Sequence, residues 1–258
     1  MQREILLKRV RSMKKLSIVL VLAFGLTLIV VWLWPPAVYV ESVESEDGYQ
    51  LKFKAEGTHV QMYADGRWQP FFAQGVNMGA AMPGHFPGEL SISMEDYMRW
   101  FGMIQEMGAN VVRVYTILKP EFYEALVKYN AQREEDPLYF MQGVWSPEER
   151  LNEIRDAFDP ELKKEFAQEI RDAVGAVYGT ADIKYVPHSG KASGTYVYNA
   201  GPYLLGWIIG TEWDPRMVER TNDLHADLPD YEGAHFRSVP AAHAFEKWLS
   251  EMMDITAQ

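Results

Sequence analysis

The chain contains no cysteine, which excludes a disulfide framework and any thiolate zinc site. Basic side chains are also scarce, because 25 Lys and Arg stand against 36 Asp and Glu and give a net charge of −11. Nucleic acid and anionic lipid surfaces both require a basic patch, so we expect no nucleic-acid partner. Stability must come from an apolar core, for which 48% hydrophobic residues provide enough material.

Long hydrophobic runs are absent except over residues 16–34, which carry no charge. This length suits a helix that crosses about 30 Å of hydrocarbon. Residues 1–15 hold six basic side chains and one acidic side chain, a balance typical of a cytoplasmic flank. A cleaved signal peptide is the alternative, but it would end in small residues, whereas this run ends at Trp32 and Trp34. We therefore expect a single-pass signal anchor in a lipid bilayer and an extracytoplasmic domain.

The remainder, residues 35–258, divides into two parts by pattern. Residues 35–70 read as a β-rich segment of short strands separated by Asp-Gly turns. From residue 71 to 258, apolar strands alternate with amphipathic helices, which is typical of an α/β fold with a parallel sheet. The four predicted strands of this sheet are 71–76, 111–115, 138–145 and 203–210.

Polar and aromatic side chains follow each of these four strands. In a parallel barrel the reacting groups lie where strands end, so these residues form the candidate site. They are Asn77 for the first strand, Arg113 and Tyr115 for the second, Gln142 and Trp145 for the third, and Thr211, Glu212, Trp213 and Asp214 for the fourth.

The order and spacing of three motifs resemble the clan of retaining glycoside hydrolases built on (β/α)8 barrels, which includes cellulase-like and β-galactosidase-like families. The motifs are Gly-Val-Asn at 75–77, Met-Gly-Ala-Asn-Val-Val-Arg at 107–113, and the glutamate Glu212 after the fourth strand. The resemblance implies a TIM-barrel-like domain in which Glu212 is the catalytic acid/base. The family usually has asparagine before this glutamate, where this chain has Thr211.

The chemistry of the residues agrees with that role. A retaining glycosidase needs one protonated carboxylic acid and a second carboxylate about 5 to 5.5 Å away. Glu212 lies between an apolar strand and Trp213, where desolvation would raise a carboxyl pKa. Arg113 would orient a carboxylate or hydroxyl, and Tyr115, Trp145 and Trp213 offer faces for sugars. The alternatives are an Arg113 ion pair, packing roles for the tryptophans, and a turn at Asp214.

The chain after residue 70 holds only four of the eight strand-helix units of a complete barrel. We therefore expect the N-terminal half of such a domain, with the clan's nucleophile beyond Gln258.

Two functions are expected on this basis. One is a membrane-anchored glycoside hydrolase or transglycosylase acting on a polysaccharide, and the other is a non-catalytic carbohydrate-binding or scaffold domain. A protein-interaction module is a third, weaker alternative. No cofactor is expected, and the histidines lack the spacing of metal ligands.

Overall fold

The computed structural model describes residues 40–46, 48–187 and 189–258, which belong to the unit that begins at Val38. Among these residues no helix is both long and apolar enough to cross a membrane. The longest, α5 (Pro160–Tyr178), has 19 residues but carries exposed charges such as Lys164 and Arg171. This corrects the predicted fold class and localisation, which included a transmembrane helix. The predicted segments 1–15 and 16–34 themselves lie outside the described residues.

The β-rich segment forms two small antiparallel sheets. Its main hairpin turns at Asp65 and Gly66, whose φ angles of 53° and 70° suit the two-residue turn that joins right-twisted strands. Phe71, predicted to open the first parallel strand, instead pairs with Val60 in this hairpin. One sheet contains β1 (Val43–Glu44) and β2 (Gln50–Leu51), and the other contains β3 (Phe53–Glu56), β4 (His59–Ala64) and β5 (Arg67–Phe71).

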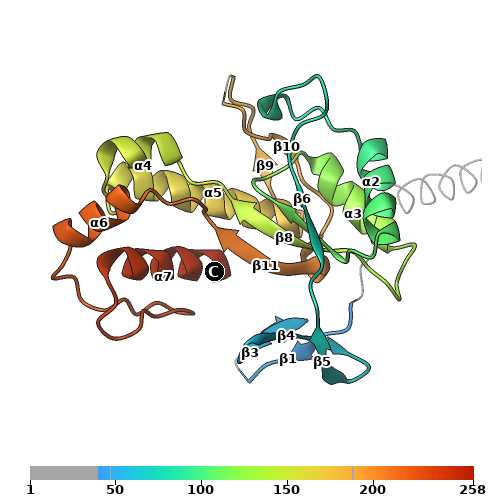
Figure 1. The fold of residues 1–258 in the computed structure, drawn as a ribbon, viewed down its shortest axis with the longest axis horizontal. Helices are drawn as coiled ribbons and strands as arrows, with labels where there is room; N and C mark the ends of the chain where they lie inside the picture. The colour runs from blue at the N-terminus through green and yellow to red at the C-terminus, as the bar shows by residue number, and fades with distance from the viewer. Residues whose placement is uncertain (1–39, 47, 188) are drawn as a thin grey trace, which may run out of the picture. The chain divides into compact units, whose positions relative to one another are not determined.

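The central sheet has four parallel strands, as the alternation of strands and helices predicts (Figure 1). Their spatial order β6-β7-β8-β11 is the same as their order along the chain. Such an arrangement results when each crossover places the next strand beside the previous one. The strands are β6 (Gly75–Met78), β7 (Val111–Val114), β8 (Tyr139–Val144) and β11 (Leu204–Ile209).

The helices begin at residues that favour a helix start. Ser93 and Asp96 form a capping box, Pro120 is the first residue of its helix, and Asp159 accepts two backbone hydrogen bonds. Besides α5, the helices are α2 (Met94–Glu106), α3 (Pro120–Asn130), α4 (Glu148–Ile154), α6 (Pro215–Leu224) and α7 (Ala244–Ala257). Short 3-10 turns occur at η1 (Pro87–Glu89) and η2 (Gly201–Tyr203), and a small hairpin is formed by β9 (Asp182–Ile183) and β10 (Gly194–Thr195).

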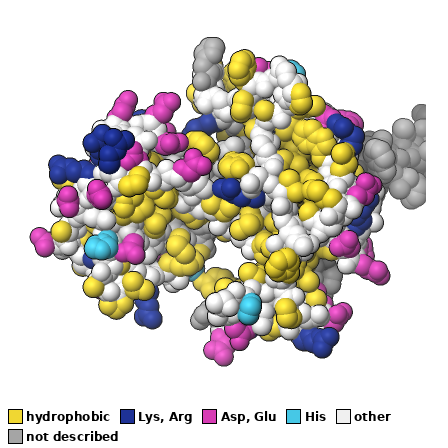
Figure 2. Space-filling model, in the orientation of Figure 1, with side chains coloured by type: hydrophobic (Ala, Val, Ile, Leu, Met, Phe, Trp, Pro, Cys, Tyr) yellow, Lys and Arg dark blue, Asp and Glu magenta, His cyan; other side chains and the backbone are white. Residues whose placement is uncertain are grey.

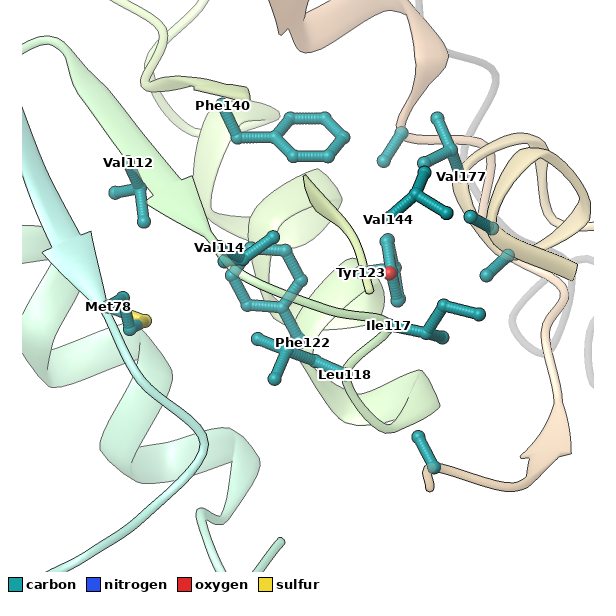
Figure 3. Packing of buried hydrophobic residues seen from close by; sticks show 14 of the residues in the cluster. Met78, Val112, Val114, Ile117, Leu118, Phe122, Tyr123, Phe140, Val144 and Val177 are labelled. Atoms are coloured by element: carbon teal, nitrogen blue, oxygen red, sulfur yellow. The ribbon is translucent and has the colours of Figure 1, made fainter. Parts of the chain in front are cut away.

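Side-chain alternation divides the parallel sheet into two faces. Val112, Val114 and Phe140 are fully buried in the main core, together with Phe122 of α3 and Val177 of α5 (Figure 3). Neighbouring residues in a strand point to opposite faces. Arg113 and Met141 therefore lie on the other face, which we call the open face.

The three-stranded sheet covers the amino-terminal end of the open face. Tyr139, at the start of β8, meets Phe53 and Phe71 edge to face with ring centroids 4.9 and 5.6 Å apart. The Tyr139 hydroxyl donates to the sulfur of Met62, and burial raises the pKa of this tyrosine to about 12. This aromatic contact leaves the carboxyl-terminal end of the strands for a site.

Asp254 of α7 holds the loop that precedes this helix. Its carboxylate accepts backbone hydrogen bonds from Ala234, His235 and Phe236 at 3.2, 2.6 and 2.9 Å. These bonds, with the His235 bond the strongest cause, lower the Asp254 pKa from 3.8 to about 2. The carboxylate therefore stabilises the fold fully above about pH 4, and this contribution is lost as the pH falls toward 2.

Replacing Asp254 by asparagine is expected to lower the melting temperature by roughly 3 °C or more near neutral pH. The difference from the unaltered chain should shrink below about pH 4, because protonation removes the same charge from Asp254. Thermal melts followed by circular dichroism across this range measure it, with the exposed Asp223→Asn as the control. A difference that does not change with pH would contradict the assigned role.

Candidate functional site

Four residues form a row across the parallel sheet, near the carboxyl-terminal ends of β6 and β7. Strand register pairs Asn77 with Arg113, Arg113 with Met141, and Met141 with Gly206. Asn77 is exposed and Arg113 is half-buried. Two of the predicted site residues, Asn77 and Arg113, are thus direct neighbours on the open face.

Arg113 lies against an aromatic ring. Its guanidinium carbon is 4.3 Å from the ring centroid of Tyr115, which is itself half-buried. The Arg113 Nε is buried and has no hydrogen-bond partner among the described residues. The predicted alternative of an ion pair with a buried carboxylate is not seen within this part of the chain.

Glu212 follows β11 in an unusual backbone conformation. Its φ of 56° lies in the left-handed region, which non-glycine residues rarely adopt. Gly210, two residues earlier, also has a positive φ of 68°, and a Cβ there would lie 2.1 Å from the Trp213 ring. The Glu212 side chain is exposed, so the desolvation that the sequence suggests is not seen. Residues with this backbone conformation occur often at functional sites, and Asp65, Leu90, Arg155 and Ala241 also adopt it among the described residues.

Trp213 is half-buried and packs against aromatic side chains of two helices. Its ring meets Phe166, Phe245 and Trp248 edge to face at centroid distances of 6.1, 5.3 and 5.6 Å. These partners belong to α5 and α7, so Trp213 points into the helix layer. These contacts favour the packing alternative over the assignment as a sugar platform.

Gln142 and Asp214 both have partners within the protein. Gln142 is fully buried, accepts a hydrogen bond from the Tyr123 hydroxyl at 2.9 Å, and donates to the carbonyl of Thr116 at 3.0 Å. Asp214 caps α6 and pairs with Arg216 at 2.8 Å, and this partner lowers its pKa to about 2. Gln142 is therefore not accessible to a substrate, whereas Asp214 is a surface residue engaged by Arg216.

Trp145 and Thr211 complete the predicted set. Trp145 follows β8 with 46% of its surface exposed, which leaves an aromatic face accessible at the strand ends. Thr211 is half-buried and directly precedes Glu212. Figure 2 shows hydrophobic side chains over the strands in the view of Figure 1, and acidic side chains mainly at the margins.

A cavity of about 760 Å³ that the sequence did not predict lies beside α5. Charged residues of both signs line it, including Glu169 of α5, which is buried and paired with Lys191 at 2.8 Å. Thr116, which follows β7, lies at one side. The cavity is formed by segments distant in sequence, so no local pattern could have revealed it. Its charges are largely paired with one another, and neither Arg113 nor Glu212 lines it.

Metal ligation has no structural basis in the described part of the chain, where no three His, Asp or Glu side chains form a suitable group. His225 contacts Asp156 at 2.8 Å, and His235 contacts the Tyr49 hydroxyl. Both contacts join separate segments of the fold.

The chain was compared with protein-family models, curated proteins and solved structures, and none matches it. Nothing in these comparisons bears on the resemblance to the glycoside hydrolase clan, which rests on the motifs alone.

Proposed function

We propose that this protein is a glycoside hydrolase or transglycosylase that acts on a polysaccharide, with Glu212 as general acid/base. The observation that carries the proposal is the position of Glu212. It is an exposed carboxyl group in a left-handed conformation directly after the fourth parallel strand. Its neighbours Trp213 and Asp214 are both engaged in packing and capping, which leaves Glu212 as the reactive group of this loop.

The proposed chemistry assigns two proton transfers to Glu212. The protonated acid donates to the glycosidic oxygen as the bond to the anomeric carbon breaks and a second carboxylate, which would come from outside the described residues, bonds to that carbon. The Glu212 carboxylate then takes a proton from water in hydrolysis, or from a sugar hydroxyl in transfer, as that oxygen displaces the second carboxylate from the anomeric carbon. Trp145 supplies an accessible aromatic face on which the apolar side of a sugar ring can stack.

A non-catalytic carbohydrate-binding domain is the second candidate, and one observation favours it. Retaining and inverting glycosidases both require a second carboxyl group near the first. Among the described residues that follow the four strands, Asp214 is the other predicted carboxylate, and it is held by Arg216 and the α6 backbone. In this case aromatic and polar residues would hold a glycan without cleaving it.

In a protein that also supplies the second carboxyl group, replacing Glu212 by glutamine is expected to reduce glycoside hydrolysis at least about 100-fold, since a positioned general acid contributes that much. The rate is measured with a panel of aryl glycosides and oligosaccharides. Glu219→Gln, an exposed change on α6, is the matched control and should leave the rate unchanged.

The outcomes separate the two candidates. Hydrolysis that persists unchanged in Glu212→Gln would reject the acid/base assignment. Oligosaccharide binding without any hydrolysis, and without dependence on Glu212, would instead support the carbohydrate-binding function.

A further inference from the structure

The cavity beside α5 has the size of a ligand site and contains a buried charged side chain. Its volume of about 760 Å³ lies within the range of about 300 to 1,000 Å³ that is typical of such sites. Glu169 of α5 lines the cavity although it is only 7% exposed. Thr116, which also lines it, belongs to the loop that follows β7, so the cavity adjoins the carboxyl-terminal end of the parallel strands.

The described residues of the loop between β9 and β10 form one wall of the cavity. From this loop the Lys191 ammonium donates to the Glu169 carboxylate on α5 at 2.8 Å. The backbone of the same loop approaches η1 so closely that a Cβ at Gly88 would lie 3.2 Å from the Cα of Gly190. Contacts with two separate elements therefore hold this wall, and a ligand would meet a cavity that is already formed.

Charges of both signs line the cavity in equal number, although the whole chain is acidic. Its described lining residues include five basic and five acidic side chains, which sum to zero, whereas the chain carries −11. Six of these ten form ion pairs with one another: Arg150 with Glu165, Lys184 with Asp182, and Lys191 with Glu169. A balanced set of charges attracts neither anions nor cations in general, so the cavity suits a neutral polar ligand.

The ion-paired side chains keep the capacity to bind hydroxyl groups. The Arg150–Glu165 and Lys191–Glu169 pairs each show a single hydrogen bond, whereas a carboxylate has about four acceptor sites and an ammonium group has three donors. A sugar hydroxyl both donates and accepts, so it can bridge the two members of a pair without a charge of its own. Ile117 of the lining adds apolar surface for the face of a sugar ring.

We propose that the cavity beside α5 binds a neutral sugar unit of the polysaccharide, as an accessory site separate from Glu212. The inference rests on the proposed function, which supplies the polysaccharide. Hydroxyl groups of the sugar contact the buried Glu169 and its partner Lys191, and the exposed Arg150 with its partner Glu165. Because Glu212 does not line the cavity, sugar bound here would keep the polysaccharide attached between reactions.

The test is calorimetric titration of the 258-residue chain with four neutral hexasaccharides: cellohexaose, xylohexaose, mannohexaose and laminarihexaose. At least one is expected to bind. Arg150→Gln and Glu169→Gln should each weaken this binding about tenfold, since each removes a charged hydrogen-bonding group. Arg220→Gln, an exposed change on α6, is the matched control and should leave the affinity unchanged. Glu212→Gln should also retain it, because Glu212 does not line the cavity.

Weaker binding in either cavity variant, with Glu212→Gln unaffected, would support the inference. Binding of none of the four hexasaccharides, unchanged binding in the folded cavity variants, or loss of binding in Glu212→Gln would overturn it. Circular dichroism verifies that each variant is folded, and the exposed Arg150 keeps the site testable should Glu169→Gln not fold.

This result is separate from the hydrolysis assay of Glu212. Binding that depends on the cavity, in a protein whose hydrolysis does not depend on Glu212, would support the accessory site and reject the acid/base assignment. Hydrolysis that depends on Glu212, together with binding that the cavity variants do not change, would do the reverse.

Discussion

Replacing Trp248 by alanine is expected to lower the free energy of unfolding by about 4 kcal/mol, the cost typical of removing a large buried aromatic side chain. Trp248 belongs to α7 and is 1% exposed. It lies in an aromatic cluster formed by α5, α7 and the loop that follows β11. It stacks on Phe166 and Phe245 at centroid distances of 5.5 and 5.3 Å, and meets Trp213 edge to face at 5.6 Å. Alanine would leave a cavity between α5, α7 and the loop that follows β11, and the packing contacts among these segments would be lost.

Urea unfolding measures this loss, and Trp248→Phe is the matched control. Phenylalanine keeps most of the stacking and removes an indole N–H that has no partner among the described residues. The control should therefore lose much less stability than the alanine variant. An alanine variant that unfolds at the same urea concentration as the unaltered chain would show that the cluster does not hold α7 in place.

Trp213 illustrates why the sequence predicts where the strands end but not the direction in which every side chain points. Its position after an apolar strand was predicted, yet its direction depends on the positive φ angles of Gly210 and Glu212, which interrupt the alternation of a strand. A local pattern does not reveal these angles. The partners of Trp213 lie in α5 and α7, more than 30 residues away in each direction.

Gln142 is different, because the sequence contained the information that places it. Phe140, Gln142 and Val144 alternate along β8, and the two apolar residues are buried against the helices. Gln142 must therefore point to the same side. The same alternation separates Arg113 from Val112 and Val114 and assigns it to the open face.

Helix α6 and strand β5 were not predicted. Asp214 was assigned to the candidate site with a turn as the alternative, although aspartate followed by proline is also a common helix start, and here Asp214 caps α6. Pro70 weakens a strand pattern, but an edge strand tolerates proline, and β5 is an edge strand of its sheet. A local capping signal therefore explains α6, whereas pairing with β4 explains β5.

Replacing Gly143 by alanine is expected to cost about 3 kcal/mol of unfolding free energy, at the upper end for adding a single methyl group to a packed site. A Cβ at Gly143 would lie 2.5 Å from the carbonyl oxygen of Tyr115 and 2.6 Å from that of Val114. Both are backbone atoms of the neighbouring strand and its continuation, so relief requires the chain to shift at β7. Tyr115 carries the ring that lies against Arg113, so a shift of the chain at β7 would also disturb this contact.

Gly206→Ala is the control for this effect, because it adds the same methyl group to the same face of the sheet. No atom lies within 4 Å of the added Cβ, so we expect a stability change below about 1 kcal/mol. Urea unfolding of the two variants under the same conditions makes the comparison. Equal losses would mean that glycine contributes through chain flexibility at both positions, whereas a loss confined to Gly143→Ala would show that the close approach of β7 and β8 fixes the position of Tyr115 and so of Arg113.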